Sequence, residues 1–171
     1  MEKGYVHIYT GDGKGKTTAA FGLAVRALCA GKRVFVGQFV KSMQYHETRM
    51  VDKFEGIGIE QFGNGCTLTR EVDEEDIRMA HRGLERCEEI LLSGEYDIVI
   101  LDELTIALYL RMLELADVVK LLQSKRPETE LIITGRYAPQ ELIDMADLVT
   151  EMREVKHYYT QGVLSRDGID R

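Results

Sequence analysis

Residues 10–18 read Thr-Gly-Asp-Gly-Lys-Gly-Lys-Thr-Thr and place glycine, lysine and hydroxyl residues at the spacing of a phosphate-binding loop. The glycines can adopt the positive φ values that turn consecutive backbone N–H groups toward one anion. Lys16 would reach the phosphates, and the hydroxyl of Thr17 would bind Mg²⁺. The usual pattern, G-x-x-x-x-G-K-[ST], begins with glycine where this chain has Thr10. The segment predicts a nucleoside triphosphate site, against the simpler alternative of a glycine-rich turn.

Two acids, Asp102 and Glu103, directly follow an apolar run that ends at Leu101. A strand that ends in this way places carboxylates at the carboxyl edge of a sheet, where open α/β folds bind ligands. In phosphoryl-transfer enzymes such an acid holds Mg²⁺. The sequence leaves open which of the two acids contacts the ion, and a solvated strand end is the alternative interpretation.

Two cations also follow predicted strands. Arg136 comes after Ile132–Gly135, and Lys41 comes after Phe39 and Val40. The planar guanidinium of an arginine suits phosphate oxygens, although a surface arginine after a glycine turn is almost as common. No H-R-D segment supplies a base that would activate a hydroxyl. This absence leaves room for a reaction whose nucleophile arrives with the second substrate.

The elements that must position these residues are short apolar runs that alternate with helical stretches. The runs are continuous rather than alternating, which is typical of strands buried on both faces of a parallel sheet. Helical spacing marks Asp73–Leu92, Leu115–Ser124 and the stretch after the loop. We expect a single domain over residues 1–171 with an α/β, P-loop NTPase-like (RecA-like) fold, in which helices cover both faces of a mostly parallel sheet. The predicted strands are Tyr5–Tyr9, Arg33–Val40, Ile57–Phe62, Asp97–Leu101, Leu131–Thr134 and Leu148–Met152.

Composition limits the partners and the compartment. The 22 basic residues against 29 acidic ones give a net charge of −7, which disfavours a nucleic-acid partner. Three cysteines without C-x-x-C spacing argue against a disulfide framework or a zinc site and for a reducing compartment. No signal peptide and no apolar run of membrane-spanning length is present, so we expect a cytoplasmic protein without a membrane partner.

Four segments resemble the P-loop ATP:corrinoid adenosyltransferases. They are Tyr9–Gly22, Val99–Leu104, Arg126–Pro139 and Leu142–Asp170, and they follow the family's order over nearly the whole chain. In this family the loop usually reads T-G-D-G-K-G-K-T-T, so Thr10 fits. The resemblance implies that the Co(I) ion of a corrinoid attacks C5′ of ATP and that inorganic triphosphate leaves. Because the nucleophile is then the substrate's cobalt, no protein base is required.

The resemblance also implies roles for individual residues. Lys16 and Glu103 would be the catalytic residues, and Thr17, Glu103 and Asp102 would hold Mg²⁺ or Mn²⁺. Arg26 and Arg136 would add contacts to the nucleotide. A homodimer and a reductase partner are implied as well. The residues that would hold the triphosphate of ATP are Gly11, Asp12, Gly13, Lys14, Gly15, Lys16, Thr17 and Thr18.

Some positions differ from the family pattern. Cys66 and Leu68 stand where well-known members carry aromatic residues that press on the lower face of the corrinoid. If these two residues face the corrinoid, less apolar surface can be buried against it, which predicts a weaker grip on Co(II) corrinoid. Two other functions remain open, namely a small P-loop nucleoside kinase or NTPase and a non-catalytic ATP-dependent cobamide carrier. The leaving product, triphosphate rather than diphosphate or phosphate, separates the first of these from adenosyl transfer.

Overall fold

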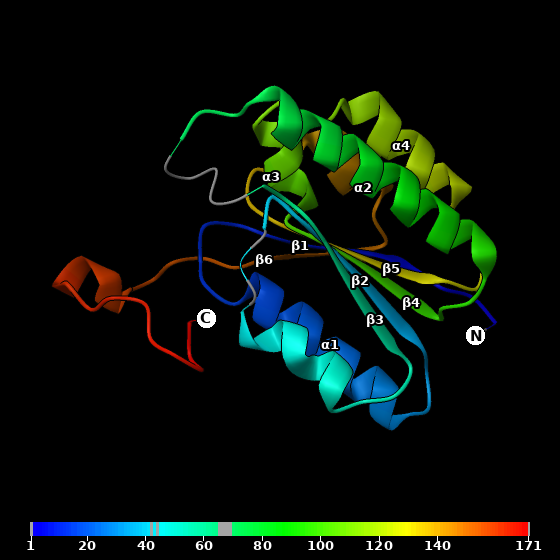
Figure 1. Ribbon diagram of the computed structural model, residues 1–171, viewed down its shortest axis with the longest axis horizontal. Helices are drawn as coiled ribbons and strands as arrows, with labels where there is room; N and C mark the ends of the chain where they lie inside the picture. Colours follow the sequence, from blue (N-terminus) through cyan, green and yellow to red (C-terminus); the bar gives the residue numbers. More distant parts are fainter. Residues whose placement is uncertain (1, 42, 44, 65–69, 171) are drawn as a thin grey trace.

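One fully parallel, six-stranded sheet organises the chain (Figure 1). The computed structural model describes residues 2–41, 43, 45–64 and 70–170. The strand order is β3-β2-β4-β5-β1-β6. All six predicted strands are confirmed. The elements are β1 (Val6–Thr10), α1 (Lys16–Cys29), β2 (Val34–Phe39), η1 (His46–Asp52), β3 (Ile57–Phe62), α2 (Glu74–Ser93), β4 (Ile98–Asp102), α3 (Leu104–Tyr109), α4 (Leu115–Ser124), β5 (Glu130–Thr134), α5 (Gln140–Met145), β6 (Leu148–Glu151) and η2 (Tyr158–Gln161).

Helices cover both faces of the sheet, as expected for strands made of continuous apolar runs. In Figure 1, α1 lies below the sheet, and α2, α3 and α4 lie above it. Successive residues of β4 point to opposite faces: Ile98 and Ile100 pack with the buried side of α1, whereas Val99 and Leu101 pack in the larger cluster under α2 and α4. The predicted fold class is therefore confirmed.

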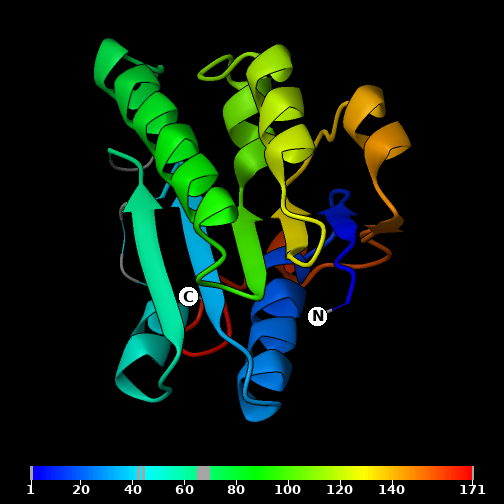
Figure 2. The ribbon, with the colours of Figure 1, turned by 90° about the vertical axis from the view of Figure 1, so that its right-hand side faces the viewer.

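The parallel arrangement brings the carboxyl ends of the strands to one edge, and the arrowheads in Figure 2 all point the same way. β5 lies between β1, which leads into the phosphate loop, and β4, which ends at Asp102. Residues that follow β1, β2, β4 and β5 thus gather at one edge although the sequence separates them widely. This edge is where open α/β sheets bind their ligands.

The chain beyond β6 also lies at this edge. Residues 152–170, here called the terminal segment, extend past the carboxyl ends of the strands and include η2 (orange to red in Figure 1). Its last residues turn back toward the phosphate loop, where Lys14 Nζ lies 2.8 Å from Asp170 Oδ1. None of the helices in the described ranges is both long and apolar enough to cross a membrane.

Candidate nucleotide and metal site

The phosphate loop has the geometry that its glycines predict. Gly11 and Gly15 have φ values of 95° and 114°, a conformation that residues with a Cβ rarely adopt. The ammonium of Lys16 donates to the carbonyl oxygens of Gly11 (2.8 Å) and Gly13 (2.7 Å), so the side chain curls over the loop. Burial, and then the positive charge of Arg136, lower the pKa of Lys16. An anion bound in the loop would stabilise the charged form of Lys16 and so offset both the burial and the repulsion by Arg136.

The loop is packed against the start of the terminal segment. The N–H of Gly13 donates to the carbonyl of Met152 (2.7 Å), and the N–H of Met152 donates to the carbonyl of Thr10 (2.8 Å). A Cβ added at Gly11 or Gly13 would lie 2.5 or 2.7 Å from the Met152 oxygen. Glycine is therefore needed here for close approach of two backbones, and the Gly13 amide holds the loop in place.

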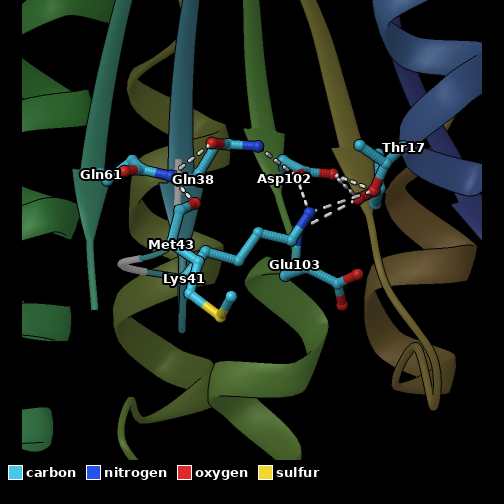
Figure 3. A network of polar contacts seen from close by, with 8 residues as sticks. Thr17, Gln38, Lys41, Met43, Gln61, Asp102 and Glu103 are labelled. Atoms are coloured by element: carbon cyan, nitrogen blue, oxygen red, sulfur yellow. Dashed lines mark hydrogen bonds and ion pairs between the residues drawn. The ribbon is translucent and has the colours of Figure 1, made fainter. Parts of the chain in front are cut away.

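Asp102 is the centre of a buried hydrogen-bond network (Figure 3). Its Oδ1 accepts from the hydroxyls of Thr17 (2.8 Å) and Thr134 (2.7 Å). Its Oδ2 accepts from Lys41 Nζ (2.8 Å) and Gln38 Nε2 (3.0 Å). The carboxylate is fully buried, and burial acts to raise its pKa, but the charge and hydrogen bond of Lys41 bring the pKa below its ordinary value. Asp102 is therefore ionised at neutral pH and fully occupied as an acceptor.

Glu103 differs from its neighbour. Its backbone lies in the left-handed region (φ 60°), and its N–H donates to the hydroxyl of Thr134 (3.0 Å). From the described part of the chain its carboxylate accepts no hydrogen bond, and in Figure 3 it points away from the network around Asp102. Burial, followed by the negative charge of Asp102, raises the pKa of Glu103. A residue held in a strained backbone conformation with an unsatisfied carboxylate is typical of a functional position.

The oxygen atoms at this edge fit Mg²⁺ or Mn²⁺ together with phosphates. The available donors are the hydroxyl of Thr17 and the carboxylate of Glu103, both of them hard ligands, and the carboxylate of Asp102 holds the Thr17 hydroxyl by a hydrogen bond. Among the described residues there is no group of three or more His, Cys, Asp or Glu that could enclose a metal alone. Mg²⁺ does not require one, because it is commonly held by one or two carboxylates plus substrate phosphates and water.

Two other cations predicted to bind ATP lie beside the loop. Arg136 Nη2 donates to the carbonyl of Asp12 (3.1 Å). Lys14 pairs with Asp170 and donates to the carbonyl of Ile169 (3.1 Å). The hydrogen bond from Lys14 is also the main reason why the pKa of Asp170 lies below its ordinary range. The fold therefore brings Arg136 to the loop, and Lys14, a residue of the loop, is already paired to a carboxylate of the terminal segment.

The remaining predicted residues lie in different places. Thr18 directly follows Thr17 at the end of the loop and is exposed on the first turn of α1. Arg26 lies in the last turn of α1, ten residues after Lys16 and thus about 15 Å along the helix. The chain itself therefore does not carry Arg26 to the phosphate loop. Cys66 and Leu68 lie outside the described residues.

Sequence reasoning missed Gln38, Thr134 and Met152. Gln38 is fully buried in the middle of the apolar strand β2, and its Oε1 accepts from Gln61 Nε2 (3.0 Å). A lone polar residue inside an apolar run was the available signal, because such a group must find a buried partner. Thr134 and Met152 had no comparable signal, since their partners lie far away in the sequence.

Comparison with known proteins gives consistent results. The model of the family described as "ATP:corrinoid adenosyltransferase BtuR/CobO/CobP" matches residues 2–170. A corrinoid adenosyltransferase of Sinorhizobium sp. is 36% identical over 174 residues, which cover 99% of this chain and 81% of that protein. One from Escherichia coli K12 is 36% identical over 169 residues (99% and 86%), and one from Pseudomonas aeruginosa is 34% identical over 171 residues (99% and 84%).

Proposed function

The chain belongs to the ATP:corrinoid adenosyltransferase family, and we propose that its loop at Gly11–Thr18 holds the triphosphate of ATP during adenosyl transfer. Family members move the adenosyl group of ATP to cobalamin. In this reaction the Co(I) of the corrinoid donates an electron pair to C5′ and forms a Co–C bond. The C5′–O bond breaks, and its electron pair leaves with triphosphate.

The observation that carries this proposal is the convergence of Lys16, Thr17 and two carboxylates at the edge of the sheet. Lys16 would turn from the loop carbonyls to the triphosphate, whose negative charge grows as the C5′–O bond breaks. Asp102 already accepts four hydrogen bonds, so it has no free lone pair with which to act as a base toward a hydroxyl. Adenosyl transfer to cobalt needs no protein base, so this occupied carboxylate is compatible with it.

A divalent ion completes the proposed site. We assign Thr17 and Glu103 as its direct ligands, because the Glu103 carboxylate is the one without hydrogen bonds from the described residues. Asp102 would orient the Thr17 hydroxyl, with which it makes a 2.8 Å hydrogen bond. When bound, Mg²⁺ or Mn²⁺ would neutralise charge on the leaving triphosphate.

The proposal extends to the surroundings of the enzyme. A homodimer, a reductase that supplies Co(I), and a cytoplasmic location are implied by the family resemblance. The thiols of Cys29 and Cys87 are free, which fits a reducing compartment. Size-exclusion chromatography with light scattering would test the dimer.

An anaerobic assay with ATP, Mg²⁺ and Co(I) cobalamin tests the function. We expect adenosylcobalamin and inorganic triphosphate as products. Lys16→Ala should lower the rate by about 100-fold or more, because it removes a charge-assisted contact to the leaving group. Lys120→Ala, on the exposed side of α4, is the matched control and should keep the wild-type rate. Release of diphosphate or phosphate, or a Lys16→Ala rate within a few-fold of wild type, contradicts the proposal.

The metal ligands are tested separately. Glu103→Gln should raise the Mg²⁺ concentration that gives half the maximal rate, because an amide is a weaker ligand than a carboxylate. An unchanged Mg²⁺ dependence in this variant contradicts the assignment of Glu103 but leaves the reaction itself in place.

A further inference from the structure

Lys41 lies beside the hydroxyl of Thr17, one of the two direct ligands of the proposed metal site. Its Nζ is 2.8 Å from Asp102 Oδ2 and 3.5 Å from Thr17 Oγ1. The side chain is only 18% exposed. Figure 3 shows the ammonium between Thr17 and Asp102, with Glu103 below it. One positive charge thus occupies the space between a hydroxyl and two consecutive acids.

The position of Lys41 places a positive charge beside two neighbouring carboxylates. Asp102 is fully buried and ionised, and Glu103 adds a second carboxylate next to it. Burial alone would lower the pKa of Lys41, but the charges of Asp102 and Glu103 outweigh burial and raise it. Lys16 and Arg136 also attract Glu103, but the ammonium of Lys16 donates its hydrogen bonds to the loop carbonyls. Among the described residues, Lys41 is the cation that is hydrogen-bonded to Asp102.

The geometry points to Lys41 as a built-in substitute for the divalent cation, which holds the position beside Thr17 and the two acids until metal and triphosphate arrive together. This role rests on the metal site proposed above. It assigns to Lys41 a positioning function in the loading of the site, since its ammonium lies 3.5 Å from the Thr17 oxygen that would bind the metal and is attracted by the charge of Glu103.

The backbone next to Lys41 is tightly held, so replacement of the ammonium by a metal would require movement of the Lys41 side chain alone. The preceding residue, Val40, is buried in the left-handed conformation (φ 63°), which is rare for a β-branched residue. Gly63 packs against the same stretch of backbone, so closely that an added Cβ would lie 2.5 Å from the backbone nitrogen of Lys41. Release of the ammonium would therefore take place by rotation of the four-carbon stem, and the ring of Tyr45, whose centre lies 5.8 Å from Nζ, offers a neighbouring position for it.

This competition predicts the order of binding. A metal ion that enters alone must displace an ammonium and leave it partly buried beside a divalent charge, which is unfavourable. Metal that enters with triphosphate brings new anionic oxygens with which the displaced ammonium can pair. The wild-type protein should therefore bind the metal–ATP complex well and the free metal poorly.

Direct measurement of Mn²⁺ binding without nucleotide tests the inference, with calorimetry or the spin resonance of free Mn²⁺ as the readout. Lys41→Met removes the charge and keeps most of the stem, and should bind Mn²⁺ alone about tenfold or more tighter than wild type. Lys41→Arg keeps the charge and should bind as weakly as wild type. Lys120→Met is the matched control, because it breaks an exposed lysine–aspartate pair of 3.2 Å on α4.

Thermal melting provides a second readout. Lys41→Met should melt at a lower temperature than wild type, because two acids lose their cation, and Mn²⁺ alone should restore the melting temperature. If Lys41→Met does not fold without metal, Mn²⁺ should restore a cooperative transition. Failure of Mn²⁺ to do so, or equal Mn²⁺ affinities in wild type and Lys41→Met, overturns the inference. Wild type that fails to bind Mn²⁺–ATP contradicts the proposed function instead, so the two failures are distinguishable.

Discussion

Replacing Asp102 by asparagine would remove the charge at the centre of the buried network without changing the size of the side chain. Four donors now share its two oxygens: Thr17, Thr134, Gln38 and Lys41. An amide offers one oxygen and one NH₂ group, so two of the four donors must lose their acceptor. We expect the amide oxygen to stay with Lys41 and Gln38, because the threonine hydroxyls can rotate to accept, whereas the ammonium of Lys41 has no acceptor and the amide oxygen of Gln38 already accepts from Gln61.

The cost follows from burial and charge. Breaking a buried ion pair by removing one partner typically costs about 3–5 kcal/mol. The Lys41 side chain keeps 18% exposure and the attraction of Glu103, so we expect the lower end, about 3 kcal/mol. At 2–4 °C for each kcal/mol in a domain of this size, the melting temperature should fall by roughly 6–12 °C.

Urea unfolding followed by far-UV circular dichroism at pH 7, without metal or nucleotide, measures this loss. Asp117→Asn is the matched control, because Asp117 pairs with an exposed lysine and should cost less than about 1 kcal/mol. Adding Lys41→Met to Asp102→Asn should cost less than Lys41→Met costs in the wild type, since the two residues stabilise each other. If Asp102→Asn loses no more stability than Asp117→Asn, Asp102 is not the electrostatic centre described here.

Two further predictions concern the loop and the pH dependence of stability. Gly13→Ala should weaken ATP binding in calorimetry by about tenfold or more, because its Cβ would lie 2.7 Å from the Met152 oxygen and must push the loop away. Gly22→Ala lies in the middle of α1, where an added Cβ would meet nothing within 4 Å, and should bind ATP normally and gain up to about 1 kcal/mol of stability. Equal affinities in both variants would contradict the packing argument. Asp76, at the start of α2, has its pKa lowered mainly by a hydrogen bond from Arg70. The ionised Asp76 therefore stabilises the fold fully at pH values above its unfolded pKa of about 3.9. This stabilisation is lost as the pH falls through the lower pKa of the folded state. Asp76→Asn should therefore show a shallower loss of unfolding free energy between pH 5 and 2 than wild type, and parallel curves would refute this.

The sequence by itself determined the glycine-rich loop after β1, the strands and the edge of the sheet where the candidate site lies. These features depend on local patterns. Glycines at fixed spacing allow the loop geometry that Gly11 and Gly15 adopt, and short continuous apolar runs are typical of strands buried on both faces of a sheet. The acids after β4 were predicted at this edge for the same reason, because parallel strands all end on one side.

Only the tertiary structure decided how the charges at this edge are paired. Lys41 and Asp102 are 61 residues apart in the sequence, and Thr17 and Asp102 are 85 residues apart, so no local sequence pattern could predict their hydrogen bonds. The same holds for the backbone of Met152 against the loop. Strand order brings these partners together, and burial then decides which pairing is stable, because a charge removed from water must be neutralised by whichever group the fold places beside it.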